Sequence, residues 1–526
     1  MNETASEIAG GRTFLGIEAG STRIKAVLTD SSYRVIATAS AVRENKFENG
    51  YWTYDISDIF SGLRECYLAL KKSVKEKTGE TIRKLAGIGV SGMMHGYIAT
   101  DDDGNLLVPF RTWRNTVTGA EADELTLLFG VNIPQRWSIA HLYRAIRLKE
   151  EHIRRIKHIY TLSGYIHSRL TGKNILGIGD ASGMFPVGES DYDKTMTEKF
   201  NRILEKENLP YRLEDILPIV ALAGQPAGYL SHEGAVLLDS EGDLEAGIPF
   251  CPPEGDAGTG MVATNSVRPE TGNVSAGTSV FAMIVLKEKM KNLLREIDIV
   301  STPDGKPCAM VHCNNCTTDI NAYAGIFLSF AKAAGIKTDL GGIFSLLFRL
   351  ADEGKPDCSG LCSVGYHSGE HITGITRGVP IFAGNPEIQP DVRDFMRSLL
   401  YSAVATLRIG MQLLKEKEKI NVTRLLGHGG YFREKGVGQK ILASALRTSV
   451  AVTETASEGG AYGMALLAAF MAEKDTGLSD FLDGKVFRNV PVSVTEPDET
   501  CAEGFDRYAE KYELLLRAER VIQAQD

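Results

Sequence analysis

Hydrophobic and polar positions follow two different periods along this chain. Residues 14–28 and 272–285 each contain two apolar, β-branched runs on either side of a short turn, which predicts a β-hairpin in both places. Elsewhere apolar residues recur at helical spacing. The helices predicted in this way cover residues 142–156, 319–334, 392–416, 438–446, 459–472 and 504–524. Strands and helices mixed throughout the chain predict an α/β protein.

The two hairpins carry the same kind of turn, in which Ala-Gly is followed by two hydroxyl residues. The turn residues are Gly20, Ser21 and Thr22 in the first hairpin and Gly277, Thr278 and Ser279 in the second. About half of the chain separates them. Two similar hairpins at that distance predict two related lobes that open with the same structural element.

The composition excludes several classes of protein. The chain has 526 residues, of which 43% are hydrophobic and 24% charged, and its formal net charge is -9. A net acidic chain argues against a nucleic-acid partner, because such proteins grip the phosphate backbone with basic residues. No apolar run approaches the roughly 20 residues that span a bilayer, and the polar first residues show no secretory signal. We therefore expect a cytoplasmic protein with no membrane partner.

Five of the eight cysteines are bunched in the sequence. They are Cys308, Cys313, Cys316, Cys358 and Cys362. The Cys313–Cys316 spacing is typical of a metal-ligand pair, and the second pair would complete four thiolates for a structural zinc. Neither pair has the glycine-rich context of a zinc ribbon, so free thiols in a reducing compartment are the favoured interpretation.

Glycine turns flanked by hydroxyl residues are suited to phosphate groups. A glycine lets backbone N–H groups approach a phosphate closely, and Ser or Thr hydroxyls add further donors. Two facing lobes with one such turn each could clamp a triphosphate. Hairpins also use glycine and serine for steric reasons alone, so both interpretations stay open.

Three further segments are candidates for chemistry. Asp256 stands among glycines where a loop enters a small-residue helix, so it is either a general base or a helix N-cap, and the residues alone favour the cap. His95 follows a predicted buried strand, where it is either a ligand contact or a turn residue. Residues 427–430, Gly-His-Gly-Gly, either pack against a nucleotide or form a turn that needs positive φ.

Together these segments resemble the FGGY carbohydrate kinases of the actin-like ATPase superfamily, and within them most closely the xylulokinases. The resemblance extends over about residues 14–472 with the segments in family order. The matching segments are SGMMHG at 91–96, TWRN at 112–115, RLTG at 169–172, GDASG at 179–183, GD at 255–256, SAGTS at 275–279 and GHGG at 427–430. It implies two ribonuclease-H-like lobes with a cleft between them, residues 1–262 with the sugar site and first phosphate turn, and residues 263–526 with the adenosine site.

The resemblance also implies a role for individual residues. Asp256 would be the general base that takes the proton of the attacking hydroxyl, and Glu18 would lie near the magnesium ion together with Asp256. The sugar would contact Met94, His95, Trp113, Asn115 and Asp256. ATP would bind Gly20, Ser21, Thr22, Gly277, Thr278, Ser279, Gly427, Gly429 and Gly430.

Several positions depart from the family pattern, mainly those that would contact the sugar. The departures are Glu18 for Asp, Met93 for Gln, Asn115 for Asp, Ala257 for Asn, His141 for Lys, Tyr401 for Glu and His428 for Gly. The leading hypothesis is an ATP- and magnesium-dependent kinase of a ketose or related sugar, with xylulose as the first guess. L-ribulose, sedoheptulose, L-fuculose and other polyols stay open.

Two other classes of protein compete with the kinase hypothesis. A non-catalytic sensor of nucleotide or sugar is suggested by the altered Glu18, although a sensor has no need of Asp256. A chaperone-like ATPase of the same broad fold would carry a separate peptide-binding module, for which the chain past residue 472 is too short. The resemblance further implies a homodimer, to which an exposed face of the C-terminal helix would contribute.

Overall fold

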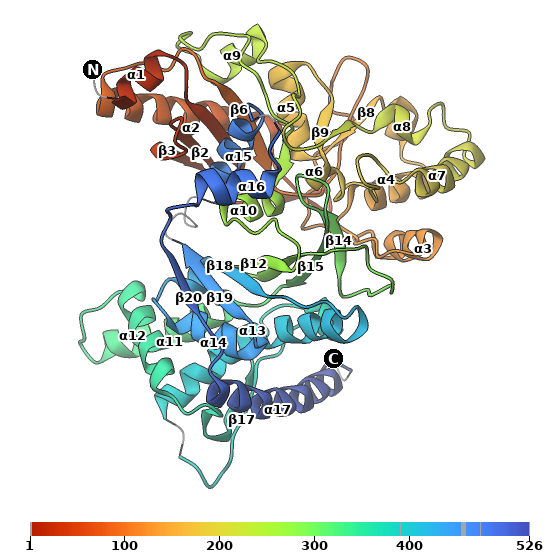
Figure 1. Cartoon of the computed structure of the whole chain (residues 1–526). Coiled ribbons are helices and arrows are strands. Elements are labelled where there is room, and N and C mark those ends of the chain that lie inside the picture. Colours follow the sequence, from red (N-terminus) through yellow and green to blue (C-terminus); the bar gives the residue numbers. More distant parts are fainter. Residues whose placement is uncertain (1–2, 390, 454–458, 474, 525–526) are drawn as a thin grey trace. The chain divides into compact units, whose positions relative to one another are not determined.

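The computed structural model describes residues 3–389, 391–453, 459–473 and 475–524 (Figure 1). The chain forms two compact units, and each is assembled from separate stretches of sequence. Unit 1 comprises Met1–Val267, Asp298–Cys308 and Glu458–Val490, and unit 2 comprises Arg268–Ile297, Ala309–Ser457 and Pro491–Asp526. The predicted boundary between lobes at residues 262 and 263 stays a prediction. Unit 1 also contains segments that come later in the chain, so no single position divides the two units.

Unit 1 is built on a sheet with strand order β11-β6-β1-β2-β3. Its strands are β1 (Phe14–Ala19), β2 (Arg23–Thr29), β3 (Val35–Val42), β6 (Gly87–Gly92) and β11 (Glu254–Gly255). The predicted hairpin is confirmed, because β1 and β2 pair antiparallel around the 20–22 turn. β6 runs parallel to β1, and β11 runs parallel to β6. The carboxyl ends of these three strands therefore meet at one edge.

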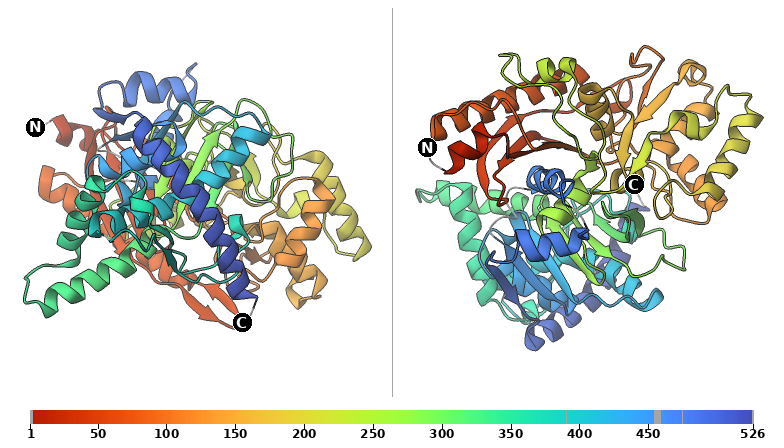
Figure 2. Two further views of the ribbon diagram at one scale, coloured as in Figure 1. Left: turned by 90° about the horizontal axis from the view of Figure 1, so that it is seen from below. Right: turned by 45° about the horizontal axis from the view of Figure 1, so that its top comes forward.

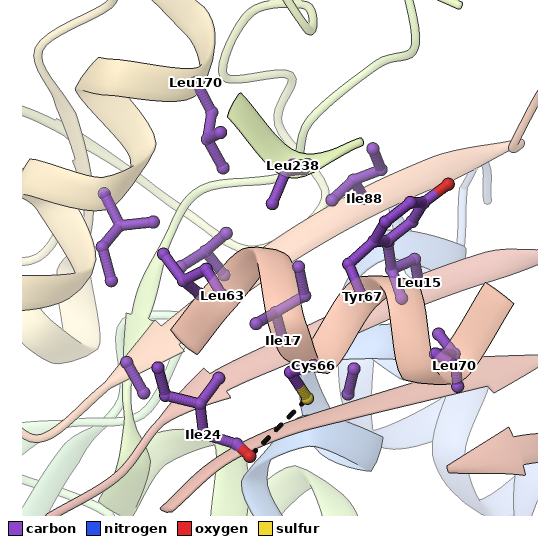
Figure 3. Close-up of a cluster of buried hydrophobic side chains, with 14 of the residues drawn as sticks. Leu15, Ile17, Ile24, Leu63, Cys66, Tyr67, Leu70, Ile88, Leu170 and Leu238 are labelled. Atoms are coloured by element: carbon purple, nitrogen blue, oxygen red, sulfur yellow. Dashed lines mark hydrogen bonds between the residues drawn. The ribbon is translucent and has the colours of Figure 1, made fainter. Parts of the chain in front are cut away.

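The core of unit 1 lies between this sheet and helix α2 (Ile56–Thr78), as Figure 3 shows. Leu63, Tyr67 and Leu70 of α2 point toward Leu15 and Ile17 of β1, and all are fully buried. The helix begins at the Asp55 cap, whose carboxylate accepts the N–H of Ser57, and ends before Gly79 at φ 81°. These apolar side chains recur at three- and four-residue spacing on one stripe of the helix.

Helix α15 (Gly459–Phe470) packs unusually closely against β1 and α10 (Asp256–Ala263). A Cβ atom at Gly463 would lie 2.0 Å from the carbonyl oxygen of Thr259, and one at Gly16 would lie 2.0 Å from that of Ala461. The sequence prediction of a small-residue helix in close contact with its neighbours is therefore confirmed. This contact explains why residues far along the chain belong to unit 1.

The remaining elements of unit 1 surround this centre. They are α1 (Glu3–Ala9), β4 (Lys46–Glu48), β5 (Tyr51–Thr53), β7 (Ile98–Thr100), α3 (Gly119–Phe129), α4 (Ser138–Arg147), η1 (Glu151–Arg155), β8 (His158–Tyr160), α5 (Leu162–Thr171), β9 (Ile175–Gly177), α6 (Ile178–Ala181), α7 (Lys194–Lys206), α8 (Leu213–Ile216), β10 (Ile219–Ala221), α9 (His232–Leu238), β14 (Asp298–Ser301), α16 (Leu478–Phe481) and the π-helical turn η6 (Leu482–Val486). The single helix predicted for 142–156 is wrong, because α4 ends at Arg147 and Lys149 takes φ +51°.

Unit 2 repeats the same arrangement of strands. β12 (Thr271–Ala276) and β13 (Val280–Val285) form the second predicted hairpin, and β18 (Arg424–His428) runs parallel to β12. β19 (Ser449–Thr453) is parallel to β18, and β20 (Val492–Thr495) closes this side antiparallel to β19. β15 (Pro307–Cys313) lies beyond β13 in the strand order. The prediction that both lobes open with the same element is confirmed.

The described long helices of unit 2 lie close to their predicted positions, except α12, which the sequence analysis did not predict. They are α11 (Thr317–Ala333), α12 (Leu340–Glu353), α13 (Val392–Lys417), α14 (Val437–Leu446) and α17 (Glu499–Gln523), with the short elements η2 (Cys358–Gly360), β16 (Cys362–Val364), η3 (His371–Thr373), β17 (Ile381–Ala383) and η4 (Gly430–Phe432). Figure 2 shows α17 as one long, uninterrupted helix in dark blue. None of the described helices is long and apolar enough to cross a membrane.

All eight cysteines are buried. Burial raises the pKa of Cys316 and of Cys362, so both thiols stay protonated at neutral pH. Over the part of the chain that the structure describes, no group of three or more His, Cys, Asp or Glu side chains is placed to hold a metal ion. The interpretation of the cysteine cluster as thiols in a reducing compartment stays a prediction.

A buried ion-pair cluster fixes the loop after α9 to helix α2. Lys71 Nζ lies 2.9 Å from Asp239 Oδ2 and 2.7 Å from Asp243 Oδ2, and the side chains of Lys71 and Asp239 are 5% and 0% exposed. Asp239 also accepts the backbone N–H of Leu244 at 2.9 Å. Removing one member of such a cluster leaves the other charge buried without a partner.

We predict that Lys71→Met lowers the free energy of unfolding of unit 1 by about 3–5 kcal/mol, because Asp239 then keeps an uncompensated buried charge. Denaturant unfolding followed by circular dichroism measures this change. Lys72→Met is the matched control, since Lys72 is 78% exposed and its only ion pair described, with Glu76, spans 3.9 Å. Equal stability of the two variants would contradict the prediction.

Candidate functional site

Three parallel strands bring the acidic residues of unit 1 to one edge of its sheet. Glu18 of β1 is opposite Ser91 of β6, and Ser91 is opposite Glu254 of β11. The residues that follow each strand are the 20–22 turn, the segment with Met94 and His95, and Asp256. Ligands of open α/β sheets bind at this carboxyl edge. The structure therefore brings together sequence segments that are more than 150 residues apart.

Asp256 is the first residue of α10 and is partly exposed. Its Oδ1 atom accepts the backbone N–H of Met94 at 3.2 Å. Burial raises the pKa of Asp256 to about 6, against the effect of backbone N–H groups that lower it. The N-cap interpretation of Asp256 is wrong, because Gly255 holds the N-cap position. A carboxylate placed in this way is ionised at neutral pH and able to accept a proton.

Glu18 is the second carboxylate of the edge. Burial raises its pKa to about 7, the nearby Asp256 carboxylate raises it further, and Lys25 opposes the rise. Gly460 at the start of α15 leaves room for this side chain, because a Cβ there would lie 2.7 Å from Glu18 Oε1. Two carboxylates that repel each other at one edge are a suitable oxygen donor set for a hard divalent cation.

Glu254 and Asp180 form a deeper acidic pair that the site prediction did not include. Glu254 accepts the backbone N–H of Gly179 at 3.2 Å and that of Asp180 at 2.9 Å, and burial raises its pKa to about 8. Burial also raises the pKa of Asp180 to about 7, and its Oδ2 atom accepts the hydroxyl of Thr161 at 2.7 Å. A Cβ at Gly177 would lie 2.2 Å from Glu254 Oε1. In the sequence, the glycines close to Asp180 were the one sign that another group approaches this segment closely.

Met94 and His95 are buried at the same edge. Met94 lies against Gly255, where a Cβ would be 2.2 Å from its Cγ atom. His95 takes φ +69°, which is rare for a residue other than glycine, and its Nδ1 atom lies 3.1 Å from the carbonyl oxygen of Gly183. This conformation turns the His95 side chain toward the 179–183 segment rather than along the strand.

Trp113 connects two of the predicted site segments directly. Its indole N–H donates to Ser21 Oγ at 3.2 Å, so a predicted sugar residue supports the first phosphate turn. Asn115 is buried, and its side chain accepts the N–H of Trp52 at 2.7 Å and donates to the Trp52 carbonyl at 2.8 Å. Those bonds fix the position of β5. Sugar binding by Asn115 stays a prediction.

The turn at residues 277–279, which is predicted to bind phosphate, lies at the corresponding edge of the sheet in unit 2. The backbone N–H of Thr317, at the start of α11, donates to the carbonyl of Gly277 at 3.0 Å, and the Thr318 hydroxyl donates to that of Thr278 at 3.2 Å. The turn is thus anchored through its carbonyl groups. At the end of β18, Gly429 takes φ +101°, and a Cβ there would lie 2.4 Å from the carbonyl oxygen of Ala276. Gly429 therefore meets the steric requirement of a turn.

A cavity of about 290 Å³ lies beside these turns within unit 2. Its lining residues are Thr317, Asn321, Leu340, Gly341, Phe344, Ser345, Phe348, Gly430, Arg433 and Glu434. Of the predicted ATP residues, Gly430 lines the cavity, whereas Gly427 packs under the ring of Phe432 and Gly429 under Ala276. The apolar wall from α12 was missed, since its helical stripe is indistinguishable from an ordinary core stripe in the sequence.

Comparison with known proteins defines the family. Residues 13–262 match the N-terminal domain model of the FGGY family of carbohydrate kinases, and residues 272–472 match its C-terminal domain model. The chain belongs to this family. It is therefore a carbohydrate kinase, a class that uses ATP, and the prediction of an α/β protein with two actin-like lobes is confirmed.

Individual relatives are distant, and the xylulose kinases among them cover most of the chain. The xylulose kinase of Haemophilus influenzae is 22% identical over 465 residues, which are 85% of this chain and 89% of that protein. The L-fuculokinase of Escherichia coli is 25% identical over 249 residues, 45% of this chain and 48% of that one. The crystal structure of xylulose kinase from Rhodospirillum rubrum has a TM-score of 0.77 at 19% identity, covering 97% and 99% of the two chains.

Two buried carboxyl groups lie behind the second phosphate turn. Burial raises the pKa of Asp319, on α11, to about 8, and the neighbouring Glu370 adds to the rise. Burial likewise raises the pKa of Glu370 to about 7, although the N–H of Asn314 donates to it at 2.7 Å. Asp319 Oδ1 has no hydrogen-bond partner among the described residues. Both groups therefore hold protons that the unfolded chain has already released above about pH 4.

We predict that unit 2 loses stability as the pH rises from about 4 to about 8, the interval between the unfolded and folded pKa values of Asp319 and Glu370. Between its two pKa values each acid is protonated in the folded state and ionised in the unfolded chain. Stability therefore falls across that interval, by up to about 1.4 kcal/mol per pH unit for each group, and levels off above the folded-state pKa. Amide hydrogen exchange of α11 measures this locally. Asp319→Asn should flatten the pH dependence. An unchanged slope in that variant would contradict the assignment.

Proposed function

We propose that this protein transfers the γ-phosphate of ATP to a hydroxyl group of a ketose or related sugar, with Asp256 as the general base. The observation that carries the proposal is the position of Asp256 at the carboxyl edge of the sheet, held by the N–H of Met94 and accompanied by Glu18. With a pKa of about 6, Asp256 is ionised at neutral pH and is matched to accept the proton of an alcohol as it attacks.

We assign the magnesium ion of the reaction to Glu18 and Asp256. The donor set fits, because both are carboxylates and the charge of Asp256 raises the pKa of Glu18, a repulsion that a bound cation relieves. When bound, magnesium neutralises charge on the β- and γ-phosphates. The chain itself supplies the two carboxylates, the base and the turn that holds the phosphates.

The nucleotide contacts divide between the turns and the cavity of unit 2. The turn residues Gly20, Ser21, Thr22, Gly277, Thr278 and Ser279 supply N–H and hydroxyl donors to the phosphates. We assign the adenosine to the cavity beside Gly430, where Phe344 and Phe348 of α12 provide aromatic surface for the base. Gly427 and Gly429 shape the strand end that leads into it.

The names of the relatives suggest which sugar to test first, and Met94 and His95 are among its proposed contacts. Xylulose is the first substrate to test, because several relatives bear the name xylulose kinase. L-ribulose, sedoheptulose and L-fuculose follow, since the Trp113–Asn115 segment departs from the xylulokinase pattern and one relative is an L-fuculokinase. The second candidate function is a non-catalytic sensor, which the longer carboxylate of Glu18 favours and Asp256 opposes.

The setting of the activity is also part of the proposal. We place the protein in the cytoplasm, where ATP and sugars are available, with a small-molecule sugar as its partner. A homodimer is supported by the exposed apolar side chains of α17, among which Leu514 and Val521 are 59% and 62% exposed.

We predict ADP release that depends on magnesium and on one sugar of a panel of ketoses, aldoses and polyols. Asp256→Ala should abolish this sugar-dependent release, because the attacking hydroxyl loses its proton acceptor. Wild type and variant are assayed side by side. A flat panel for a wild-type protein that binds ATP would favour the sensor, and a flat panel without ATP binding would refute the kinase proposal.

We predict that Phe344→Ala weakens ATP binding about 5–100-fold, the loss expected when a base loses its aromatic contact. The KM for the sugar should stay near its wild-type value. Leu346→Ala is the matched control, since Leu346 lies on the same helix, is 44% exposed and does not line the cavity. Equal ATP affinities of the two variants, measured by calorimetry, would exclude adenosine from this cavity.

A further inference from the structure

Trp137 lies beside His95 and is held there by the residues on either side of it. The two rings stack with centroids 6.4 Å apart and planes 17° apart. The carbonyl of Arg136 accepts the N–H of Gly96 at 3.1 Å, and the hydroxyl of Ser138 donates to the Gly96 carbonyl. Because Gly96 follows His95 directly, these bonds fix the Trp137 ring relative to the His95 segment.

The contact of His95 with Gly183 determines which of its ring nitrogens carries the proton. The carbonyl oxygen of Gly183, 3.1 Å from Nδ1, only accepts hydrogen bonds, so Nδ1 is the protonated nitrogen. In the neutral ring Nε2 is then a hydrogen-bond acceptor. A Cβ at Gly183 would lie 2.7 Å from Nδ1, so the absence of a side chain at this position is what permits the contact.

The indole N–H of Trp137 is a buried donor with no acceptor among the described residues. The side chain is 2% exposed, and buried polar groups in folded proteins nearly always have partners. His141, one helical turn further along, is also fully buried, and burial together with Arg111 and Arg144 lowers its pKa to about 3, so it stays neutral. An unsatisfied donor beside a sugar-binding histidine points to an acceptor that arrives with the substrate.

We propose that Trp137 is a specificity-determining residue whose indole N–H donates to a hydroxyl of the bound sugar. This inference rests on the proposed function of the same site. Trp137 Nε1 supplies a buried donor beside His95, which is the complement of a sugar hydroxyl oxygen. This donor selects a polyhydroxylated substrate that carries a hydroxyl at this point and discriminates against the deoxy analogue, whose binding leaves the buried N–H unpaired.

The test compares wild type and Trp137→Phe, each assayed with the sugar that the panel identifies and with its deoxy analogues. D-xylulose is the first sugar to test. Phenylalanine keeps an aromatic ring and removes the N–H. We expect kcat/KM for the parent sugar to fall about 10–100-fold, with the KM for ATP unchanged. One deoxy analogue should be turned over equally well by wild type and variant, since neither can form the bond. Trp52→Phe, with a ring against Arg114, should show no such coupling.

A spectroscopic readout separates this inference from the kinase proposal. The chain has three tryptophans, so protein labelled with ¹⁵N-tryptophan gives three indole signals, and the one lost in Trp137→Phe belongs to Trp137. We expect this signal to move when the parent sugar is added and to stay in place with the matching deoxy analogue. Equal losses of kcat/KM for the sugar and every deoxy analogue, with an unmoved indole signal, would assign Trp137 a purely structural role. A wild type that binds the sugar with the expected shift but does not phosphorylate it would refute the kinase proposal and leave this one standing.

Discussion

The parallel register of β1, β6 and β11 is the constraint on which the site depends. It aligns Glu18, Ser91 and Glu254 across three strands, and Asp256 follows directly after the end of β11. Carboxylates gathered in this way are costly to bury, and their raised pKa values are the direct sign of that cost. The surrounding structure accommodates them with close backbone contacts, such as those of Gly177 and Gly179 around Glu254, and with N–H groups that donate to their oxygens.

The two units use one backbone plan for different chemistry. In unit 1 the hairpin and the parallel strand beside it end in carboxylates and in the Met94–His95 segment. In unit 2 the same hairpin and parallel strand end in glycines and hydroxyl residues, next to a cavity with an aromatic wall. In the proposed function, the acidic groups of one unit serve proton transfer and a cation, and the neutral donors of the other serve an anionic ligand. The same hairpin and parallel strand therefore end in negatively charged groups in unit 1 and in neutral hydrogen-bond donors in unit 2.

Local features of this chain were readable from the sequence, and long-range contacts were not. The hairpins around Gly20 and Gly277 and the close packing of α15 follow from periodicity and residue size, so they were predicted. The break after Arg147 depends on a positive φ at Lys149, for which lysine gives no signal. The pairing of β6 with β11 joins residues more than 160 positions apart, and only that pairing reveals Glu254 and Asp180 as partners of the site.

The same distinction applies to the predicted site residues. Asp256, Glu18, Met94 and His95 lie at one edge as the family pattern implied, because the motifs mark where strands end. Asn115 shows the opposite case, since its amide is engaged by the backbone of Trp52, a contact that no motif records. Trp137 belongs to no motif at all, and its interest comes from a buried N–H that has no partner among the residues the structure describes. Whether a buried donor has an acceptor depends on which residues the fold brings together, so a sequence pattern cannot show it.

The central claim is that Asp256 acts on the proton of the sugar rather than merely helping to bind it. The most direct measurement is a single-turnover transfer of labelled γ-phosphate by Asp256→Asn, with the sugar and ATP affinities measured on the same sample. The account predicts affinities close to those of the wild type and a transfer rate at least about 100-fold lower. A rate that recovers fully at saturating sugar would show that Asp256 serves binding alone and would contradict the account.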